Sequence, residues 1–233
     1  MTEQSFFIDQ NTLTLLQIGN TQFMESAQID MLNLWNSLNS TIKNELIKQI
    51  STSDPVVMTL TFETAKEIKY EDIPKLLSGG HFAYKIVNNT IQPYTQFMNM
   101  DTEESYIYKG VYQSSQGVGS LDRSYIIDSN SLDLLLMNNS QFMNSAQKDL
   151  LNLWNSLNDV QKEIVKMRLN IQHEIVIMTL AFDVVKVVDR NQVTKLPDPQ
   201  NIGFKEVNTE IDPYTQLRNA VTGQGYLYKG LYY

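Results

Sequence analysis

Acidic side chains recur at equivalent positions in the two halves of the chain and are candidates for acid–base catalysis. They form the pairs Asp9/Asp128, Asp30/Asp149 and Glu63/Asp183. Two carboxylates can act as general acid and general base when a protein holds them at suitable pKa values. Nothing in the spacing of these acids requires that arrangement. An enzyme using Asp30 and Asp149 is therefore the least favoured of three functional hypotheses.

Histidine and cysteine, the commonest catalytic and metal-binding residues, are scarce. The chain has no cysteine and only two histidines, His81 and His173, at non-equivalent positions. This excludes thiol catalysis, disulfides and a histidine site present in both halves. No Walker sequence occurs, and Gly117-Val118-Gly119 precedes no phosphate-binding helix. We expect no catalytic residue, no metal and no cofactor.

Repeated aromatic and amide residues are better candidates for binding. A tryptophan usually packs in the core, but an indole ring also stacks on sugars and aromatic ligands. The motif Pro-Tyr-Thr-Gln predicts an ordered loop, because proline restricts the backbone. This loop can frame the mouth of a pocket, and it can equally form a plug under the sheet. In the repeated motif Tyr-x-Tyr-Lys-Gly-x-Tyr, alternate tyrosines share one face of a strand. The predicted binding residues are Trp35, Trp154, Tyr94, Tyr214, Tyr108, Tyr228, Asp30, Asp149, Asn33 and Asn152.

The two halves match because the chain contains an internal duplication. Gln22–Asn39 and Gln141–Asn158 are identical at fifteen of 18 positions, reading QFMESAQIDMLNLWNSLN and QFMNSAQKDLLNLWNSLN. The segment between the halves is rich in Gln, Ser and Gly, which is typical of a flexible linker. We therefore predict copy 1 at 1–113, a linker at 114–123 and copy 2 at 124–233. Two whole domains related by a pseudo-two-fold axis resemble a homodimer made covalent.

Identity between the copies is uneven along the chain. The segments 40–50 and 159–169 share only one of eleven positions. The preceding helix, by contrast, keeps its polar side as well as its apolar side. The repeated polar stripe comprises Gln22, Ser26, Asp30, Asn33 and Ser37, with Gln141, Ser145, Asp149, Asn152 and Ser156. Packing between the two copies explains this restraint, and so does a ligand or partner surface.

The elements that position these residues follow from hydrophobic periodicity. Helices are expected at 11–18, from 20 or 21 to 39, and at 40–50. The long helix turns Phe23, Ala27, Met31, Leu34 and Leu38 toward the core. Strands are expected at 56–62, 65–70, 81–88 and 106–112, and in copy 2 at 174–182, 184–188, 203–208 and 226–232. Helices precede strands in each copy, which predicts an α+β fold with a mainly antiparallel sheet.

Composition narrows the range of partners. The chain has a net charge of −8, which opposes tight binding to nucleic acid. No apolar run reaches the roughly 18 residues of a membrane span. The first residues lack the pattern of a secretion signal, so we expect a cytoplasmic protein. A protein exported by a non-classical route would show the same features.

Duplication without catalytic signatures favours a non-enzymatic interaction or structural protein. Its two lobes would pair mainly through the long helices and present two similar surfaces to a protein or a polymer. The alternative is a small-molecule or carbohydrate binding module with two equivalent aromatic pockets. In that case Trp35, Tyr94 and their counterparts would contact the ligand.

Overall fold

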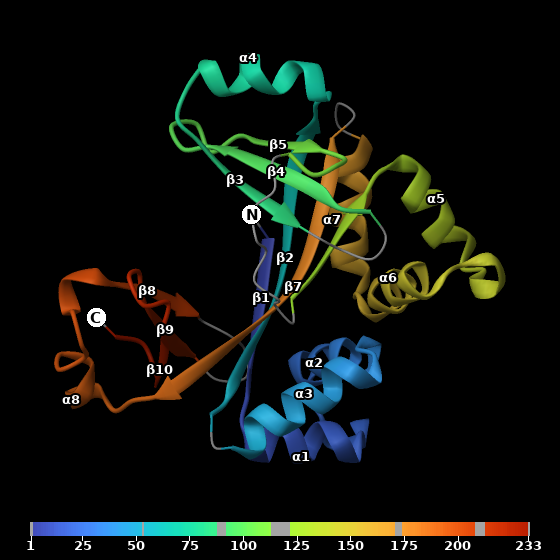
Figure 1. The fold of residues 1–233 in the computed structure, drawn as a ribbon. Coiled ribbons are helices and arrows are strands. Elements are labelled where there is room, and N and C mark those ends of the chain that lie inside the picture. The colour runs from blue at the N-terminus through green and yellow to red at the C-terminus, as the bar shows by residue number, and fades with distance from the viewer. Residues whose placement is uncertain are drawn as a thin grey trace. The chain divides into compact units, whose positions relative to one another are not determined.

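The computed structural model describes residues 2–52, 54–87, 92–112, 122–170, 174–207 and 213–232 (Figure 1). The fold is mixed α+β with one sheet of ten strands, which confirms the predicted α+β class, whereas the pseudo-two-fold relation of two lobes stays a prediction. Residues 114–121 of the predicted linker and His173 lie outside the described residues. None of the helices in the described ranges is both long and apolar enough to cross a membrane.

The first part of each copy consists of a strand followed by helices. In copy 1 these are β1 (Thr2–Ile8), α1 (Gln10–Ile18), the 3-10 helix η1 (Thr21–Phe23), α2 (Ser26–Ser37) and α3 (Ser40–Ser51). In copy 2 they are β6 (Arg123–Ile127), α5 (Ser129–Met137), η3 (Ser140–Phe142), α6 (Ser145–Ser156) and α7 (Asp159–Asn170). The predicted helices at 11–18 and 40–50 are confirmed. The strands β1 and β6 were not predicted, because their apolar residues, Phe6–Ile8 and Tyr125–Ile127, are consecutive and do not alternate with polar ones.

Side-chain caps explain where the helices begin. The Asp9 carboxylate accepts a hydrogen bond from the Thr12 backbone N–H at 3.0 Å, which starts α1. Asp128 does the same for α5 through the Ser131 N–H at 2.9 Å. Asn39 accepts from the Ile42 N–H at 3.1 Å and starts α3. The repeated acids Asp9 and Asp128 therefore act as caps, a common role for short polar side chains.

The second part of each copy carries most of the sheet. In copy 1 it comprises β2 (Val56–Glu67), η2 (Tyr70–Asp72), α4 (Ile73–Ser78), β3 (Phe82–Val87), β4 (Tyr94–Asn99) and β5 (Ser105–Tyr108). In copy 2 it comprises β7 (Ile175–Val187), α8 (Arg190–Val193), η4 (Pro199–Asn201), β8 (Ile202–Val207), β9 (Tyr214–Asn219) and β10 (Gly225–Lys229). Each pair of short strands predicted near 56–70 and 174–188 is one long strand. The predicted loops at Tyr94 and Tyr214 are the first residues of strands, because the proline precedes the strand and needs no ladder N–H.

The strand order is β3-β4-β5-β2-β7-β10-β9-β8, with β1 paired to β2 and β6 paired to β7. Pairs β3–β4, β4–β5, β6–β7, β8–β9 and β9–β10 run antiparallel. The short pairings of β5 with the end of β2, and of β10 with the end of β7, are parallel. The long strands β2 and β7 thus lead from the helical part of each copy to its antiparallel hairpins.

The compact units of the structure do not follow the two sequence copies. Unit 1 comprises Met1–Glu3 and Leu60–Leu180, and unit 2 comprises Gln4–Thr59 and Ala181–Tyr233. Unit 1 therefore combines the helices of copy 2 with the hairpin strands of copy 1. Unit 2 combines the helices of copy 1 with the hairpin strands of copy 2. The chain passes from one unit to the other within β2 and again within β7.

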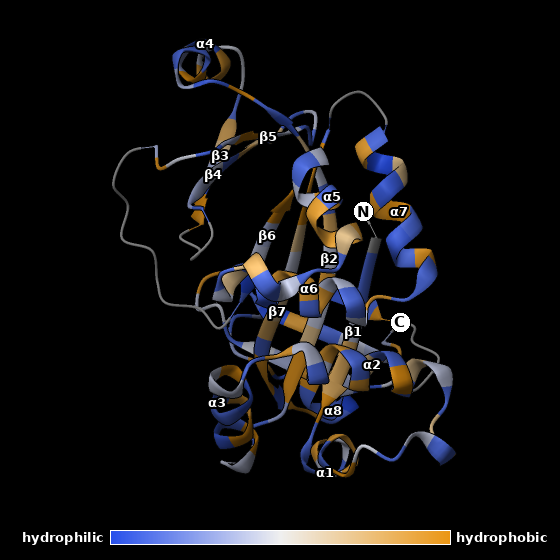
Figure 2. Ribbon diagram, turned by 90° about the vertical axis from the view of Figure 1, so that its right-hand side faces the viewer, coloured by the Kyte–Doolittle hydropathy of each residue, from blue (hydrophilic) through white to orange (hydrophobic). Residues whose placement is uncertain are grey.

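Each unit has a hydrophobic core that draws on both copies. In unit 1, Tyr94 and Ile107 of copy 1 pack with Ile175 and Ile177 of copy 2. In unit 2, Val57 of copy 1 packs with Val185, Tyr214 and Leu227 of copy 2. Figure 2 shows hydrophobic and hydrophilic residues side by side on the helices, as expected where one side of each helix is buried.

Candidate functional site

The segment with the highest identity between the copies folds as a short turn followed by a helix. Asn20 caps η1 by accepting from the Gln22 N–H at 3.0 Å, and Asn139 caps η3 through the Gln141 N–H at 3.1 Å. Met24 is extended, with φ −91° and ψ 140°, so the turn is separate from α2. The predicted single helix from residue 20 or 21 is therefore wrong at its start, since α2 begins at Ser26.

A capping box sets the start of this helix in both copies. The Gln28 side chain accepts from the Glu25 N–H at 2.9 Å, and Gln147 accepts from the Asn144 N–H at 3.0 Å. Asn144 also accepts from the Gln147 N–H at 2.9 Å. A capping residue followed three positions later by glutamine is a recognised signal for a helix start. That signal, visible in copy 2, could have placed the boundary correctly.

The turn presents a phenylalanine to solvent in each copy. Phe23 is 84% exposed and Phe142 is 86% exposed, although the predicted long helix places Phe23 toward the core. The break at Met24 removes Phe23 from the helix, so it no longer follows the apolar side of α2. An exposed large aromatic residue runs against the general tendency of such side chains to be buried.

The polar side of the helix is also accessible. Asn33 and Asn152 are exposed, as are Ser26 and Ser145. Asp30 and Asp149 are half-buried, and the Gln4 amide donates to the Asp30 carboxylate at 3.4 Å. We name Gln22, Phe23, Ser26 and Asn33, with Gln141, Phe142, Ser145 and Asn152, the repeated surface. Unit 2 carries the first set and unit 1 carries the second.

The two tryptophans lie on the opposite, buried side of the same helices. Trp35 is 4% exposed and Trp154 is 3% exposed. An indole ring this deeply buried packs against neighbouring side chains and presents no face for a ligand to stack on. The structure thus separates the tryptophans from Asn33 and Asn152, which the sequence placed in the same set of binding residues.

The tyrosines of the Pro-Tyr-Thr-Gln motifs are buried as well. The Tyr94 hydroxyl lies 2.5 Å from the Ser124 hydroxyl in unit 1. Burial raises the pKa of Tyr94 to about 12, against a smaller opposing effect of the Ser124 hydrogen bond and a small contribution from Glu63. Its counterpart Tyr214 is 3% exposed in unit 2 and lines a pocket described below.

Tyr108 and Tyr228 belong to half-buried aromatic groups. The Tyr108 ring lies 5.6 Å from Tyr70, and the Tyr228 ring lies 6.2 Å from Tyr232. Strand β5 ends at Tyr108, so the third tyrosine of the motif in copy 1, Tyr112, follows the strand instead of continuing it. These spacings are those of aromatic packing within a unit.

A repeated acid and a repeated lysine, which the sequence did not pair, meet in each unit. Lys109 lies 2.9 Å from Asp128 in unit 1, and Lys229 lies 3.4 Å from Asp9 in unit 2. In both cases the acid comes from the helical part of one copy and the lysine from the hairpin strands of the other. The sequence spacing of these residues could not predict the two pairs, because each unit takes its helices from one copy and its hairpin strands from the other.

The carboxylates of these pairs stay ionised to lower pH than usual. Burial raises the pKa of Asp9, but hydrogen bonds from Thr12 and the Lys229 charge outweigh it and lower the pKa. Burial likewise opposes the net lowering at Asp128, which comes from Ser131 and Lys109. The caps and the lysines therefore stabilise the charged form of each acid.

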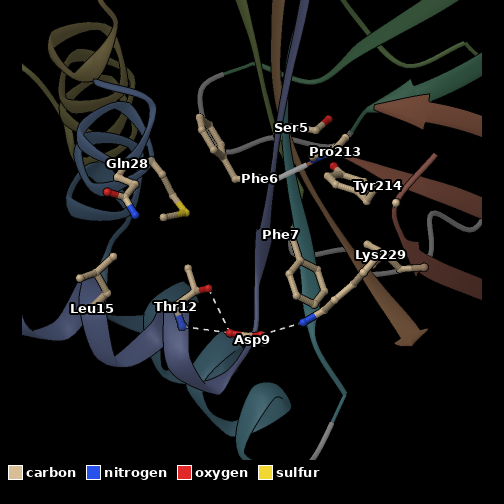
Figure 3. A pocket seen from close by; sticks show the side chains of 13 residues that line it. Ser5, Phe6, Phe7, Asp9, Thr12, Leu15, Gln28, Pro213, Tyr214 and Lys229 are labelled. Atoms are coloured by element: carbon tan, nitrogen blue, oxygen red, sulfur yellow. Dashed lines mark hydrogen bonds and ion pairs between the residues drawn. The ribbon is translucent and has the colours of Figure 1, made fainter. Parts of the chain in front are cut away.

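A pocket of about 470 Å³ lies in unit 2 beside the Asp9–Lys229 pair (Figure 3). Phe6, Leu15, Met31, Tyr214 and Leu227 contribute apolar surface to it. Figure 3 shows Asp9 bonded to Thr12 on one side and to Lys229 on the other. The pocket thus combines an apolar wall with one positive and one negative group.

The described parts of the chain contain no group of three or more acidic or histidine side chains that could hold a metal ion. His81 is strongly exposed and lies 3.2 Å from Asp101, which is a surface contact.

Comparison with protein-family models, with curated proteins and with solved structures finds no match for this chain.

Proposed function

We propose that the protein is a non-enzymatic binding protein, built as a covalent pseudo-dimer, that presents one similar surface on each of two lobes to a protein partner. The observation that carries this proposal is the identity of exposed residues. Gln22, Phe23, Ser26 and Asn33 all recur in copy 2, and all eight side chains are exposed. Packing restrains buried positions and leaves exposed ones free to vary.

The helix that follows the repeated surface is much less similar between the copies. Helices α3 and α7 share one of eleven positions in 40–50 and 159–169, so exposed positions in this chain have diverged freely elsewhere. The buried residues Leu46 and Val165 of these helices keep only their apolar character. A requirement other than folding therefore accounts for the repeated surface.

The chemistry of the repeated surface suits a protein partner. An exposed phenylalanine surrounded by serine, asparagine and glutamine resembles an aromatic anchor with a polar rim, the arrangement of many interface hot spots. Burying one such ring in a partner contributes about 2 kcal/mol. Two sites on one chain also raise the overall affinity for a partner that carries two matching sites.

Peptides selected from a displayed random library on the immobilised chain provide a direct test. Calorimetry should find two equivalent peptide sites on the unaltered chain, one in Phe23→Ser or Phe142→Ser, and none in the double variant. The reason is that each substitution removes the aromatic anchor of one site.

Phe204→Ser is the matched control for this experiment. Phe204 is another exposed phenylalanine, at 66%, but its counterpart is Tyr84 and it lies outside the repeated surface. The selected peptides should bind this variant like the unaltered chain. Unchanged binding to the double variant, or loss of binding in Phe204→Ser, would contradict the proposal.

A further inference from the structure

The pocket of unit 2 carries an inference that is independent of the repeated surface. Its volume of about 470 Å³ lies within the range of roughly 300–1,000 Å³ that is usual for small-molecule sites. Its lining residues come mainly from β1, the helices α1 and α2, and the strands β9 and β10, and all of these residues belong to unit 2. Helices and strands thus line the pocket.

The apolar wall accounts for most of its lining. Phe6, Met31, Tyr214 and Leu227 are buried, whereas Leu15 is half-buried. Such a wall binds an aliphatic or aromatic group by removing it from water. Apolar contacts contribute affinity but do not fix the orientation of a ligand, so the polar groups of the pocket must orient it.

The two charged groups each retain bonding capacity toward the pocket. Lys229 makes its single ion pair among the described residues with Asp9, at 3.4 Å, and its ammonium group has three donors. The Asp9 oxygen Oδ1 accepts both bonds from Thr12, while Oδ2 accepts the one from Lys229. The Lys229 ammonium group also lies 4.9 Å from the centre of the Phe7 ring, a second attraction that helps to hold the lysine in place.

The equivalent lysine in unit 1, Lys109, contacts two carboxylates and is less exposed than Lys229. Lys109 lies 2.9 Å from Asp128 and 3.1 Å from Glu67, and its side chain is 24% exposed. The Lys229 side chain is 60% exposed, because Val187 stands at the position equivalent to Glu67. Unit 2 therefore has an accessible cation beside a partly exposed carboxylate, since the Asp9 side chain is 28% exposed and that of Asp128 is 26% exposed.

We propose that this pocket binds the zwitterion of an α-amino acid with an apolar side chain. The ligand carboxylate contacts the Lys229 ammonium group, the ligand ammonium contacts Asp9 Oδ2, and the side chain lies against Phe6, Leu15 and Met31. A ligand with only a carboxylate would meet the like charge of Asp9. A ligand with only an ammonium group would meet that of Lys229. A zwitterion places opposite charges against both.

Ligand-observed NMR titration of the full chain with L-phenylalanine and L-leucine tests this proposal. We expect saturable binding of at least one of them. The probes 3-phenylpropionate, phenethylamine and glycine each lack one of the three recognised groups, so each should bind about tenfold more weakly or worse.

Substitutions in the charged pair should change the preference between probes. Lys229→Met should weaken amino-acid binding about tenfold and favour phenethylamine over 3-phenylpropionate, because Asp9 remains. Asp9→Ser keeps a helix cap but removes the charge, and it should shift the preference toward 3-phenylpropionate. Lys109→Met and Asp128→Ser are the matched controls in unit 1 and should leave binding unchanged.

Leu15→Trp separates occupancy of the pocket from binding elsewhere. The larger side chain fills the pocket from a half-buried position, so every probe should lose binding while the circular dichroism spectrum stays the same. Failure of both amino acids to bind would overturn the proposal. So would equal binding of the three incomplete probes, or equal effects of the unit 1 and unit 2 substitutions.

Discussion

Unit 1 and unit 2 are built from equivalent elements, and they differ in how they hold one repeated lysine. Lys109 is fixed between two carboxylates, whereas Lys229 has one, longer ion pair among the described residues and lies beside a pocket. A single difference, Glu67 against Val187, supplies or removes the second carboxylate. The comparison shows that one exposed position can turn a structural contact into an accessible site without changing the fold.

A second difference lies in the strand that precedes the helices. Unit 1 has Tyr125 where unit 2 has Phe6, and both side chains are buried. Burial and the negative charge of Asp149 raise the pKa of Tyr125 to about 12, against a smaller opposing effect of Arg123. Unit 1 has therefore kept polar groups at a position where unit 2 presents an apolar wall to its pocket.

Cutting the chain between the copies tests whether the two units exist as assigned. A wrong assignment would give the largest effect of these experiments, because the two halves would separate. Each unit contains residues from both copies, so a chain cut at a protease site inserted between residues 116 and 117 should stay associated. Size-exclusion chromatography with light scattering should find one particle of unchanged mass without denaturant. Separation into two folded halves would mean that each copy folds alone and that the two units compared here do not exist.

A change at Tyr125 should make the stability of the chain less sensitive to alkaline pH. The folded chain keeps the Tyr125 proton up to about pH 12, whereas the unfolded chain releases it near the usual value of 10.0. The free energy of unfolding is therefore unaffected below pH 10 and falls as pH rises above it. Relative to Tyr125→Phe, the unaltered chain should lose about 1 kcal/mol between about pH 9 and about pH 11.

Urea denaturation at the two pH values measures this difference. Phe6→Tyr in unit 2 is the reciprocal variant, and it should introduce an alkaline dependence of the same sign. Parallel loss of stability in the unaltered chain and Tyr125→Phe would show that the buried hydroxyl has no such effect.

Removing the two lysines should have unequal effects on stability, and the effect of removing Lys229 should be the smallest of all. Lys109→Met leaves Asp128 and Glu67 without their shared partner and should lower the free energy of unfolding by about 1 kcal/mol. Lys229→Met removes one longer, more exposed pair and should cost about 0.3 kcal/mol. Denaturation of both variants near neutral pH checks the order.

In a Glu67→Val background, Lys109→Met and Lys229→Met should lower the free energy of unfolding by more similar amounts. The effect of Glu67→Val on Lys109→Met can be measured by a double-mutant cycle, since the two residues are in direct contact. Equal costs for the two lysines in the unaltered background would contradict the interpretation of Lys109 as structural and Lys229 as accessible.

Local patterns in the sequence were enough to predict much of the secondary structure. The expected helix at 40–50 is observed at Ser40–Ser51, and the alternating segment at 56–62 lies within β2. These elements depend on periodicity and caps that are close in sequence. Strands β4 and β9 were missed because they begin directly after proline, and the start of α2 was missed because a capping box divides the segment at residue 25.

The sequence by itself determined that two segments of the chain are identical at fifteen of 18 positions, on the polar side of the predicted helix as well as the apolar side, and that the two histidines are not at equivalent positions. Tertiary structure alone decided which copy supplies the partner of each residue. Asp9 meets Lys229 and Asp128 meets Lys109, because each unit takes its helices from one copy and its hairpin strands from the other. Both copies carry the same acid and the same lysine at equivalent positions, so their local sequence does not distinguish pairing within a copy from pairing between copies.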